Sequence, residues 1–408
     1  MRLRSLMDRD AIDLVVVTSR TNVGYLSNWL THQWTWDWPF WFEMEKEYDG
    51  WDYLLFAGVP AEVPADGFFV TFDHHVSSVR NKSWIKDIRG AGRPGYATRP
   101  GLASVRLEPD TSVTHVDVAV EAITDHGFAE ATIGVEMNRM AQSVYAELTE
   151  RLPRARFVDG FETIGEIRAV KSDAEIAKLR RASEITTVVF DEVIFPMMRD
   201  RATPHVIYQA ASARAARERG YFLFFHVFVD SGHVAVGDAR SRVPVAYNID
   251  PDARLEDGQL AFVDFGCGFE GYTADIGRTV VIGGRPTDDQ HRVHAALLKA
   301  RMAIRAAIRP GVRASDVFCI GVEALDAHDL GLALSFVGHG IGLSNHENPW
   351  LTAFDHRPLE PGMVLNIEPT VEIPGMTMFT VEDTGIVTED GFEPFASPTT
   401  DLDALAPK

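Results

Sequence analysis

The chain has 408 residues, of which 46% are hydrophobic and 24% charged, and its formal net charge is −20. This length and composition fit one or two folded domains and exclude a largely disordered chain. The negative charge argues against a nucleic-acid partner, which needs clustered Lys and Arg, and no apolar run reaches the roughly 18 residues of a membrane helix. Because the start turns acidic at Asp8 before any secretory core, we expect a cytoplasmic protein. With only Cys267 and Cys319, any metal must be held by carboxylates and imidazoles.

The first 160 residues alternate between predicted strands and helices. The expected elements are strands at 11–17, 67–72 and 131–136, a turn at 21–26, a short strand and a helix within 112–125, and a helix ending at Pro153. This alternation predicts an α/β domain with a mixed or parallel sheet. We place this domain at residues 1–160.

Six of the eight tryptophans lie between Trp29 and Trp51, interleaved with polar residues that do not fit a core. The segment is either an aromatic-rich interface or loop of its own domain, or an aromatic wall over a binding site. Such a wall holds apolar groups, or cations by cation–π contact. In the second interpretation Trp36 and Trp38 contact the substrate.

A second domain, residues 161–408, is expected to begin with the helix that follows Ser172. Ser172 and Glu175 have the spacing of a capping box at a helix N-terminus. Two further helices are predicted at 288–308 and 315–329, followed by short apolar runs rich in glycine and proline. The residues from Ser397 onward are predicted to be a loose tail.

Within this domain, residues 263–275 are predicted to form a hairpin that folds about Phe269 and Glu270. This register places Asp264 directly opposite Asp275. Like charges on facing strand positions are destabilising, so a bound cation between them is one explanation. The other is that one aspartate caps the turn and the second is in solvent, and this hairpin alone does not decide between them.

A second predicted hairpin repeats the pattern. Folding the chain about Gly375 sets Glu368 opposite Glu382, again within strongly apolar strands. His339 lies between the two hairpins in the sequence, flanked by glycines that leave room for a close approach. Four carboxylates and one imidazole match the ligand demand of two adjacent divalent cations.

These residues and their surroundings resemble the M24 peptidase family, which includes methionine aminopeptidase, aminopeptidase P, prolidase and the non-peptidase creatinase. The motifs that carry the resemblance are Gly271-Tyr272-x-x-Asp275-Ile276-x-Arg278-Thr279, Gly338-His339-Gly340-Ile341-Gly342-Leu343, His346-Glu347-x-Pro349 and Glu368-Pro369. Val170-Lys171-Ser172 and Asn22-Val23-x-Tyr25-Leu26 resemble the prolidase and creatinase branch, which has an extra N-terminal domain. The resemblance implies an α/β N-terminal domain followed by an α+β pita-bread catalytic domain.

The resemblance also implies roles for single residues. Asp264 is expected to bind one metal ion, Asp275 and Glu382 to bridge two, and His339 and Glu368 to complete the second site. Manganese is the expected metal, with cobalt, iron or zinc as alternatives.

In the implied reaction, water activated by the metal ions attacks a carbonyl carbon. Glu368 then handles the proton, and His346 hydrogen-bonds the substrate or the tetrahedral intermediate. The larger members of the family are commonly homodimers, and we expect the same here.

The chain departs from the family at one histidine. Prolidases and aminopeptidase P usually carry a substrate-contacting histidine several residues after a Ser-Gly step. Here the step is Ser231-Gly232, and after His233 the next histidine is His291. His226 and His233 are therefore candidates for a substituted substrate-binding role, although His226 also fits a strand histidine satisfied by a neighbour.

We therefore predict a dinuclear-metal hydrolase that cleaves an amide or other C–N bond. Its substrate is either an Xaa-Pro dipeptide or a small non-peptide metabolite. One alternative is a lyase that is similar to the metal-dependent dimethylsulfoniopropionate lyase of this fold, which has an aspartate where this chain has Asn345. The other is a metal-free binding protein that retained the fold.

Overall fold

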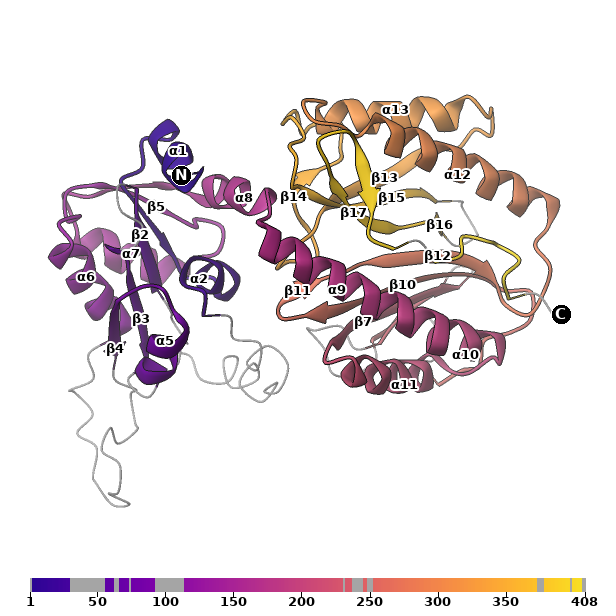
Figure 1. Ribbon diagram of the computed structural model, residues 1–408, viewed down its shortest axis with the longest axis horizontal. Helices are drawn as coiled ribbons and strands as arrows, with labels where there is room; N and C mark the ends of the chain where they lie inside the picture. Colours follow the sequence, from indigo (N-terminus) through magenta and orange to yellow (C-terminus); the bar gives the residue numbers. More distant parts are fainter. Residues whose placement is uncertain are drawn as a thin grey trace, which may run out of the picture. The chain divides into compact units, whose positions relative to one another are not determined.

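The structure is a computed structural model, shown in Figure 1. It describes residues 2–29, 56–61, 66–72, 75–91, 114–229, 232–236, 245–247, 252–372, 378–396 and 398–405. The chain divides into two compact units, Met1–Ile167 and Arg168–Lys408. Within the described ranges, no helix is both long enough and apolar enough to cross a membrane.

The first unit is built around a six-stranded sheet. Its elements are α1 (Arg2–Arg9), β1 (Leu14–Val17), α2 (Arg20–Ser27), β2 (Phe56–Pro60), β3 (Phe68–Phe72), α5 (Val76–Lys82), β4 (Asp87–Ala91), α6 (His115–Asp125), β5 (Thr132–Val135), α7 (Gln142–Arg151), β6 (Arg156–Asp159) and α8 (Phe161–Ala169). The strand order is β4-β3-β2-β1-β5-β6, with both parallel and antiparallel pairs. Every residue of the central β1 is buried, which explains its unbroken apolar sequence. The prediction of an α/β domain is confirmed.

One prediction for this unit is wrong. Residues 21–26 were expected to form a turn, but they belong to helix α2. The buried carboxylate of Glu136 accepts hydrogen bonds from the backbone N–H groups of Thr18 and Ser19 at the start of the helix. Because this acceptor lies more than 100 residues away in the sequence, local sequence signals gave no indication of the helix start.

The second unit contains two six-stranded antiparallel sheets and their covering helices. Its elements are α9 (Asp173–Val189), the π-helix η3 (Phe190–Ile194), α10 (Phe195–Arg199), α11 (Pro204–Arg217), β7 (Tyr221–Val229), β8 (Gly232–Val236), β9 (Val245–Tyr247), β10 (Leu260–Phe269), β11 (Tyr272–Thr273), β12 (Ile276–Val281), α12 (Asp288–Ala307), α13 (Ala314–Asp326), β13 (Leu334–Gly340), β14 (Glu347–Trp350), β15 (Val364–Glu372), β16 (Met378–Thr380), β17 (Asp383–Val387) and β18 (Phe392–Pro394).

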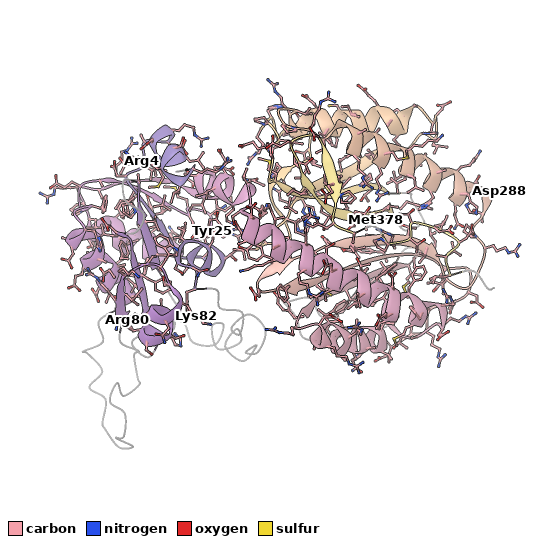
Figure 2. The ribbon with its side chains drawn as sticks, viewed as in Figure 1. Arg4, Tyr25, Arg80, Lys82, Asp288 and Met378 are labelled. Carbon is pink, nitrogen blue, oxygen red and sulfur yellow. The ribbon has the colours of Figure 1, made fainter. Side chains whose placement is uncertain are left out.

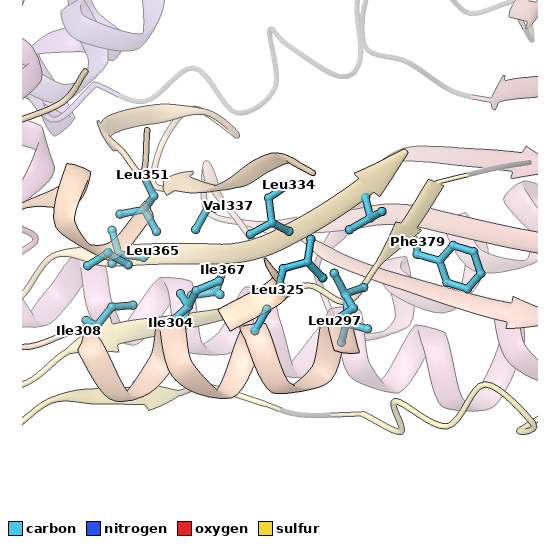
Figure 3. Packing of buried hydrophobic residues seen from close by; sticks show 14 of the residues in the cluster. Leu297, Ile304, Ile308, Leu325, Leu334, Val337, Leu351, Leu365, Ile367 and Phe379 are labelled. Carbon is cyan, nitrogen blue, oxygen red and sulfur yellow. The ribbon is translucent and has the colours of Figure 1, made fainter. Parts of the chain in front are cut away.

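The two sheets of this unit are each covered by their own helices (Figure 1). One sheet has the order β11-β10-β7-β8-β9 with β12 beside β10, and α9 and α11 pack on it. The other has the order β14-β13-β15-β17-β18 with β16 beside β15, and α12 and α13 pack on it. Figure 3 shows Ile304 of α12 beside Ile367 of β15 in this second core. Each sheet thus has one face sealed by helices.

The predicted helices of this unit are confirmed. The capping box is present at α9, where the Ser172 N–H and hydroxyl both bond Glu175 Oε2. Helix α12 begins at the predicted Asp288, whose exposed side chain is labelled in Figure 2. Helix α13 ends at Asp326, three residues before the predicted end.

The prediction of a loose tail from Ser397 is wrong for the described residues 398–405. Leu402 and Leu405 are buried in the two cores of the second unit. The carbonyls of Pro398 and Thr399 accept hydrogen bonds from the buried guanidinium of Arg278. The apolar residues in this segment are too few and too widely spaced to show a period, so their burial depends on contacts distant in sequence.

Candidate metal centre

The first acidic pair comes from β10 and the chain that follows it. The predicted register is wrong, because Asp264 faces Gly277 rather than Asp275. The turn is centred on Glu270 and Gly271, whose φ angles of 47° and 88° are those of a two-residue hairpin turn. Since side chains alternate between faces along a strand, a register change of two residues preserves the face. Asp264 and Asp275 still come together.

A third carboxylate approaches this hairpin at Gly277. A Cβ atom on Gly277 would lie 2.5 Å from Cδ of Glu382, so only glycine leaves space for the glutamate here. The backbone N–H of Glu382 donates to the Gly277 carbonyl at 3.0 Å. The first sheet therefore receives a ligand candidate from the second.

The second acidic pair has the predicted register. The pairs Ile367–Asp383 and Thr370–Thr380 flank it on both sides. Glu368 and Glu382 therefore occupy facing positions, although the residues of the connecting turn, 373–377, lie outside the described part of the chain. The Glu368 side chain is 18% exposed, whereas Glu382 is buried. Glu368 is thus the more accessible of the two.

His339, on β13, is fully buried between the two acidic pairs. Its Nδ1 lies 2.9 Å from the Gly340 carbonyl, a contact that favours a proton on Nδ1 and leaves Nε2 as the ligand atom. Nε2 lies 3.5 Å from Oε2 of Glu368 and 3.8 Å from Oδ2 of Asp275. Burial alone would lower the pKa of His339, but these two carboxylates outweigh it and raise that pKa.

The candidate ligands gather into two groups. Within each group the ligand atoms all lie within 4.8 Å of one another; the first group is Asp264, Asp275 and Glu382, and the second is His339, His346 and Glu368. The first group combines residues of both hairpins, whereas the second combines Glu368 of the second hairpin with His339 on β13 and His346 in the segment after β13. The five residues predicted as ligands are all included, and His346, predicted as a substrate contact, joins the second group.

The ionised form of each carboxylate in the first group is unfavourable. Burial, together with the neighbouring Asp275 and Glu368, raises the pKa of Asp264 well above its ordinary value. Burial raises the pKa of Asp275 to about 6, and burial with the neighbouring acids raises the pKa of Glu382 well above normal. A cluster of acids with raised pKa values is typical of a site completed by a cation.

Unsatisfied atoms in the same place support this interpretation. Asp264 Oδ1, Asp275 Oδ1, Glu382 Oε1 and His339 Nε2 are buried and have no hydrogen-bond partner among the described residues. Buried polar atoms are otherwise almost always paired. Four unpaired acceptors of the types that bind divalent cations fit a pair of metal ions.

Two amides that the sequence analysis did not assign to the site hold its carboxylates. Asn345 Nδ2 donates to Oδ2 of Asp275 at 3.0 Å, and Asn366 Nδ2 donates to Oε2 of Glu382 at 3.4 Å. Such contacts orient ligand carboxylates. The sequence offered a signal for Asn366, which lies two residues before Glu368 and so shares its face of β15.

An aromatic surface lies beside the second group. The rings of His346 and Trp350 are stacked at 5.8 Å with an interplanar angle of 11°, and the ring of His346 is 4.0 Å from that of His339. Phe336 contacts both His339 and Trp350. Trp350 is 36% exposed, so this surface is open to a bound molecule. The aromatic wall predicted from the sequence is the segment 29–51, and the surface at Trp350 was not predicted.

The two histidines proposed as substitutes differ in what the structure shows. His226 pairs with Asp264 across β7 and β10, and its Nδ1 lies 3.7 Å from Oδ2 of Asp264. Its ring is flanked by those of Phe224 and Phe228. His233 lies on β8, where its backbone pairs with Phe228. Thus His226 is beside the first ligand group.

Trp36 and Trp38, the predicted aromatic contacts, lie outside the described residues.

Comparison with known proteins identifies the same two parts of the chain. Residues 177–389 match the model of Metallopeptidase family M24, and residues 1–170 match that of the Creatinase/Prolidase N-terminal domain. An Xaa-Pro dipeptidase from Lactobacillus delbrueckii subsp. lactis is 30% identical over 279 residues, covering 67% of this chain and 73% of the relative.

Solved structures share the fold over almost the whole chain. Dipeptidase PepE from Mycobacterium ulcerans superposes with a TM-score of 0.74 at 23% identity, covering 98% of this chain and 95% of PepE. The N-terminal domain of FACT complex subunit SPT16 from chickpea gives a TM-score of 0.69 at 15% identity, covering 99% and 97%. Because proteins of different kinds share this fold, the function must be argued from the side chains and not from the fold.

Proposed function

Because the chain belongs to metallopeptidase family M24, we propose that it is a dinuclear-metal hydrolase that cleaves an amide or other C–N bond of a small substrate. The observation that carries the proposal is the set of four buried, unpaired acceptor atoms in two adjacent ligand groups. A binding protein that needed only the fold would have no use for this unfavourable cluster.

The ligand assignment keeps the five residues predicted from the family resemblance and assigns His346 of the second group to the substrate instead. Asp264 would hold one metal ion, Asp275 and Glu382 would bridge the two, and His339 with Glu368 would complete the second site. Two divalent cations, when bound, supply an activated water near neutral pH and polarise a carbonyl oxygen. Manganese is the metal that we propose, with cobalt, iron or zinc as alternatives.

The chain itself provides the proton transfers and the substrate contacts. Glu368 is partly exposed and can take the proton of the attacking water and deliver it to the leaving nitrogen. His346, on the open aromatic surface, is placed to donate a hydrogen bond to the substrate carbonyl as negative charge develops on it. His226, which lies beside the first ligand group, and His233 are proposed to contact the substrate.

We favour a dipeptide with a C-terminal proline as the substrate class. The relative described above is named an Xaa-Pro dipeptidase, and the Trp350 surface suits a ring such as that of proline. A small non-peptide metabolite is the alternative within the same reaction class. In that case Trp36 and Trp38 would bind its apolar or cationic group.

The lyase alternative is weakened by Asn345. Its amide donates to Asp275, and an amide cannot remove a proton from a substrate as a carboxylate can. We further propose that the protein acts as a homodimer in the cytoplasm, as expected from its composition and from its family.

A competition screen with manganese-loaded protein tests the proposal. Xaa-Pro dipeptides, dipeptides without proline and methylated cationic metabolites are compared, and we expect turnover of the Xaa-Pro group. Glu368→Gln should abolish that turnover. Hydrolysis of none of these compounds by the loaded protein would contradict the proposed function.

A variant in the tryptophan segment extends the same screen. If Trp36→Ala leaves the affinity of every accepted substrate unchanged, the proposed substrate contact of the segment is wrong.

A further inference from the structure

Glu347, the residue after His346, lies in a buried ion cluster. Its side chain is 9% exposed and contacts the guanidinium of Arg168, and its Oε1 lies 2.8 Å from Nζ of Lys171. Arg168 lies at the end of α8 and Lys171 in the connection between α8 and α9, more than 170 residues earlier in the sequence. The cluster therefore joins two of the motifs that carry the family resemblance through Lys171 and Glu347, two residues to which the proposed reaction gives no role.

The cations of the cluster are firmly anchored. The Lys171 side chain is 1% exposed, and its ammonium also donates to the Ala169 carbonyl at 3.1 Å. The Lys171 backbone N–H donates to the Gly362 carbonyl at 3.0 Å. Without the charge of Glu347, the two largely buried cations would lose the anion that they share, which is energetically costly. The carboxylate and both cations are therefore held in one arrangement.

From this cluster, short contacts lead to the metal centre. Arg168 Nη2 donates to the Ser344 hydroxyl at 2.9 Å, one residue before Asn345. Asn345 in turn donates to Asp275. The Thr273 N–H donates to the Gly342 carbonyl at 2.9 Å, which ties the beginning of the segment 342–349 to the strand that leads to Asp275.

We propose that Glu347, held by Arg168 and Lys171, is a positioning residue that fixes His346 and Asn345 at the metal centre. This role rests on the proposed function, because Glu347 acts on the reaction only by holding His346 and Asn345 in position and not by contacting the substrate itself. A displacement of about 1 Å at a catalytic group is enough to cost roughly 100-fold in rate.

A double-mutant cycle separates this role from a general contribution to stability. Glu347→Gln, His346→Ala and the double variant are compared with the wild type for kcat, KM, metal content and thermal denaturation. We expect Glu347→Gln to lower kcat about 10- to 100-fold with little change in KM and with bound metal retained. In the His346→Ala background, the same substitution should produce a clearly smaller loss of kcat, because only the contribution through Asn345 remains.

Glu218 provides a matched control. Its carboxylate also lies between two cations, with Arg214 at 2.9 Å and Arg181 at 2.7 Å, but it belongs to the end of α11 and has no contact with either ligand group. Glu218→Gln should leave kcat unchanged. If Glu347→Gln does not fold, Arg168→Lys serves in its place, because it keeps the charge but removes the planar fork that reaches Ser344 and Glu347.

The outcomes also separate this inference from the proposed function. Loss of activity in His346→Ala with an unaffected Glu347→Gln variant would overturn the inference alone. Full additivity of the two losses would overturn it as well, because the cluster would then act independently of His346. Unchanged activity in His346→Ala would instead contradict the role of His346 in the proposed function, and with it the basis of the inference.

Discussion

The protein buries carboxylates in both units, but it treats them in opposite ways. In the first unit, Glu136 is fully buried and accepts four hydrogen bonds. The donors are the N–H groups of Thr18 and Ser19 at 2.8 and 2.9 Å, and the Ser19 hydroxyl and Asn22 amide, both at 2.6 Å. In the second unit, three clustered carboxylates keep buried oxygens without partners among the described residues.

This difference separates an acid with a structural role from the acids that we propose as metal ligands. Glu136 is completed by the protein alone, and it fixes the start of α2. Burial and neighbouring carboxylates disfavour the ionised forms of Asp264, Asp275 and Glu382 and raise their pKa values, so they need either protons or a bound cation. Glu347 is a third case, since Arg168 and Lys171 neutralise it and hold its pKa below the ordinary value despite burial. Burial of an acid therefore does not by itself indicate a functional site. A buried carboxylate oxygen without a hydrogen-bond partner does.

The largest expected effect is that of Asp275→Asn. The substitution removes a carboxylate that we propose is shared by both metal ions, and the loss of several kcal/mol of transition-state stabilisation corresponds to a fall in kcat/KM of about 1000-fold or more. Metal-dependent thermal stabilisation should be lost as well. In metal-free protein the same variant should be more stable than the wild type, because one buried carboxylate has left a repulsive cluster. Thermal denaturation with chelator and with manganese checks both signs.

A metal-free variant that is less stable than the wild type would contradict this prediction. It would mean that Asp275 is satisfied within the protein, as Glu136 is.

The next effect is a pH dependence of metal stabilisation. Without metal, the pKa of Asp275 is raised from 3.8 to about 6, so its protonated form stabilises the fold below about pH 4, and that contribution is lost as the pH rises through 6. Metal must displace this proton. The gain in unfolding free energy on adding manganese should therefore grow between pH 5 and 7, toward about 4 kcal/mol at a 1000-fold excess over Kd, with a parallel rise in Tm. An equal increase at every pH would contradict the account.

The smallest effect is expected at Glu136→Gln. The substitution replaces a carboxylate that accepts four hydrogen bonds with an amide that can accept at one oxygen only, which should cost about 1–3 kcal/mol of stability. The loss should be the same with manganese and with chelator, because Glu136 takes no part in the metal centre. A metal-dependent loss, measured by denaturant unfolding, would remove the distinction between the two kinds of buried acid.

The sequence predicted the acidic residues better than their register. Asp264 and Asp275 were identified correctly as neighbours, although the first turn was placed one residue too early. Glu270 adopts a positive φ that its side chain does not favour, and sequence signals for such a turn point to Asn or Gly instead. The prediction that the two aspartates are neighbours still held, because a register shift of two residues keeps both side chains on one face of the sheet.

Contacts between distant segments could not be predicted. The start of α2 depends on Glu136, and the ion cluster at Glu347 depends on cations more than 170 residues away. The terminal segment packs through Leu402 and Leu405, whose neighbours come from several elements. Local patterns predict which residues lie on a face, whereas these contacts depend on how the faces are brought together.

The central claim is that the acids of the second unit are completed by two metal ions. The most direct test is calorimetric titration with manganese of protein from which metal has been removed by a chelator, followed by elemental analysis of the metal-loaded protein. We predict about two equivalents per chain in the wild type and in Glu136→Gln, and a loss of binding in Asp275→Asn. If manganese, cobalt, iron and zinc all fail to bind to the folded wild type, the claim is wrong.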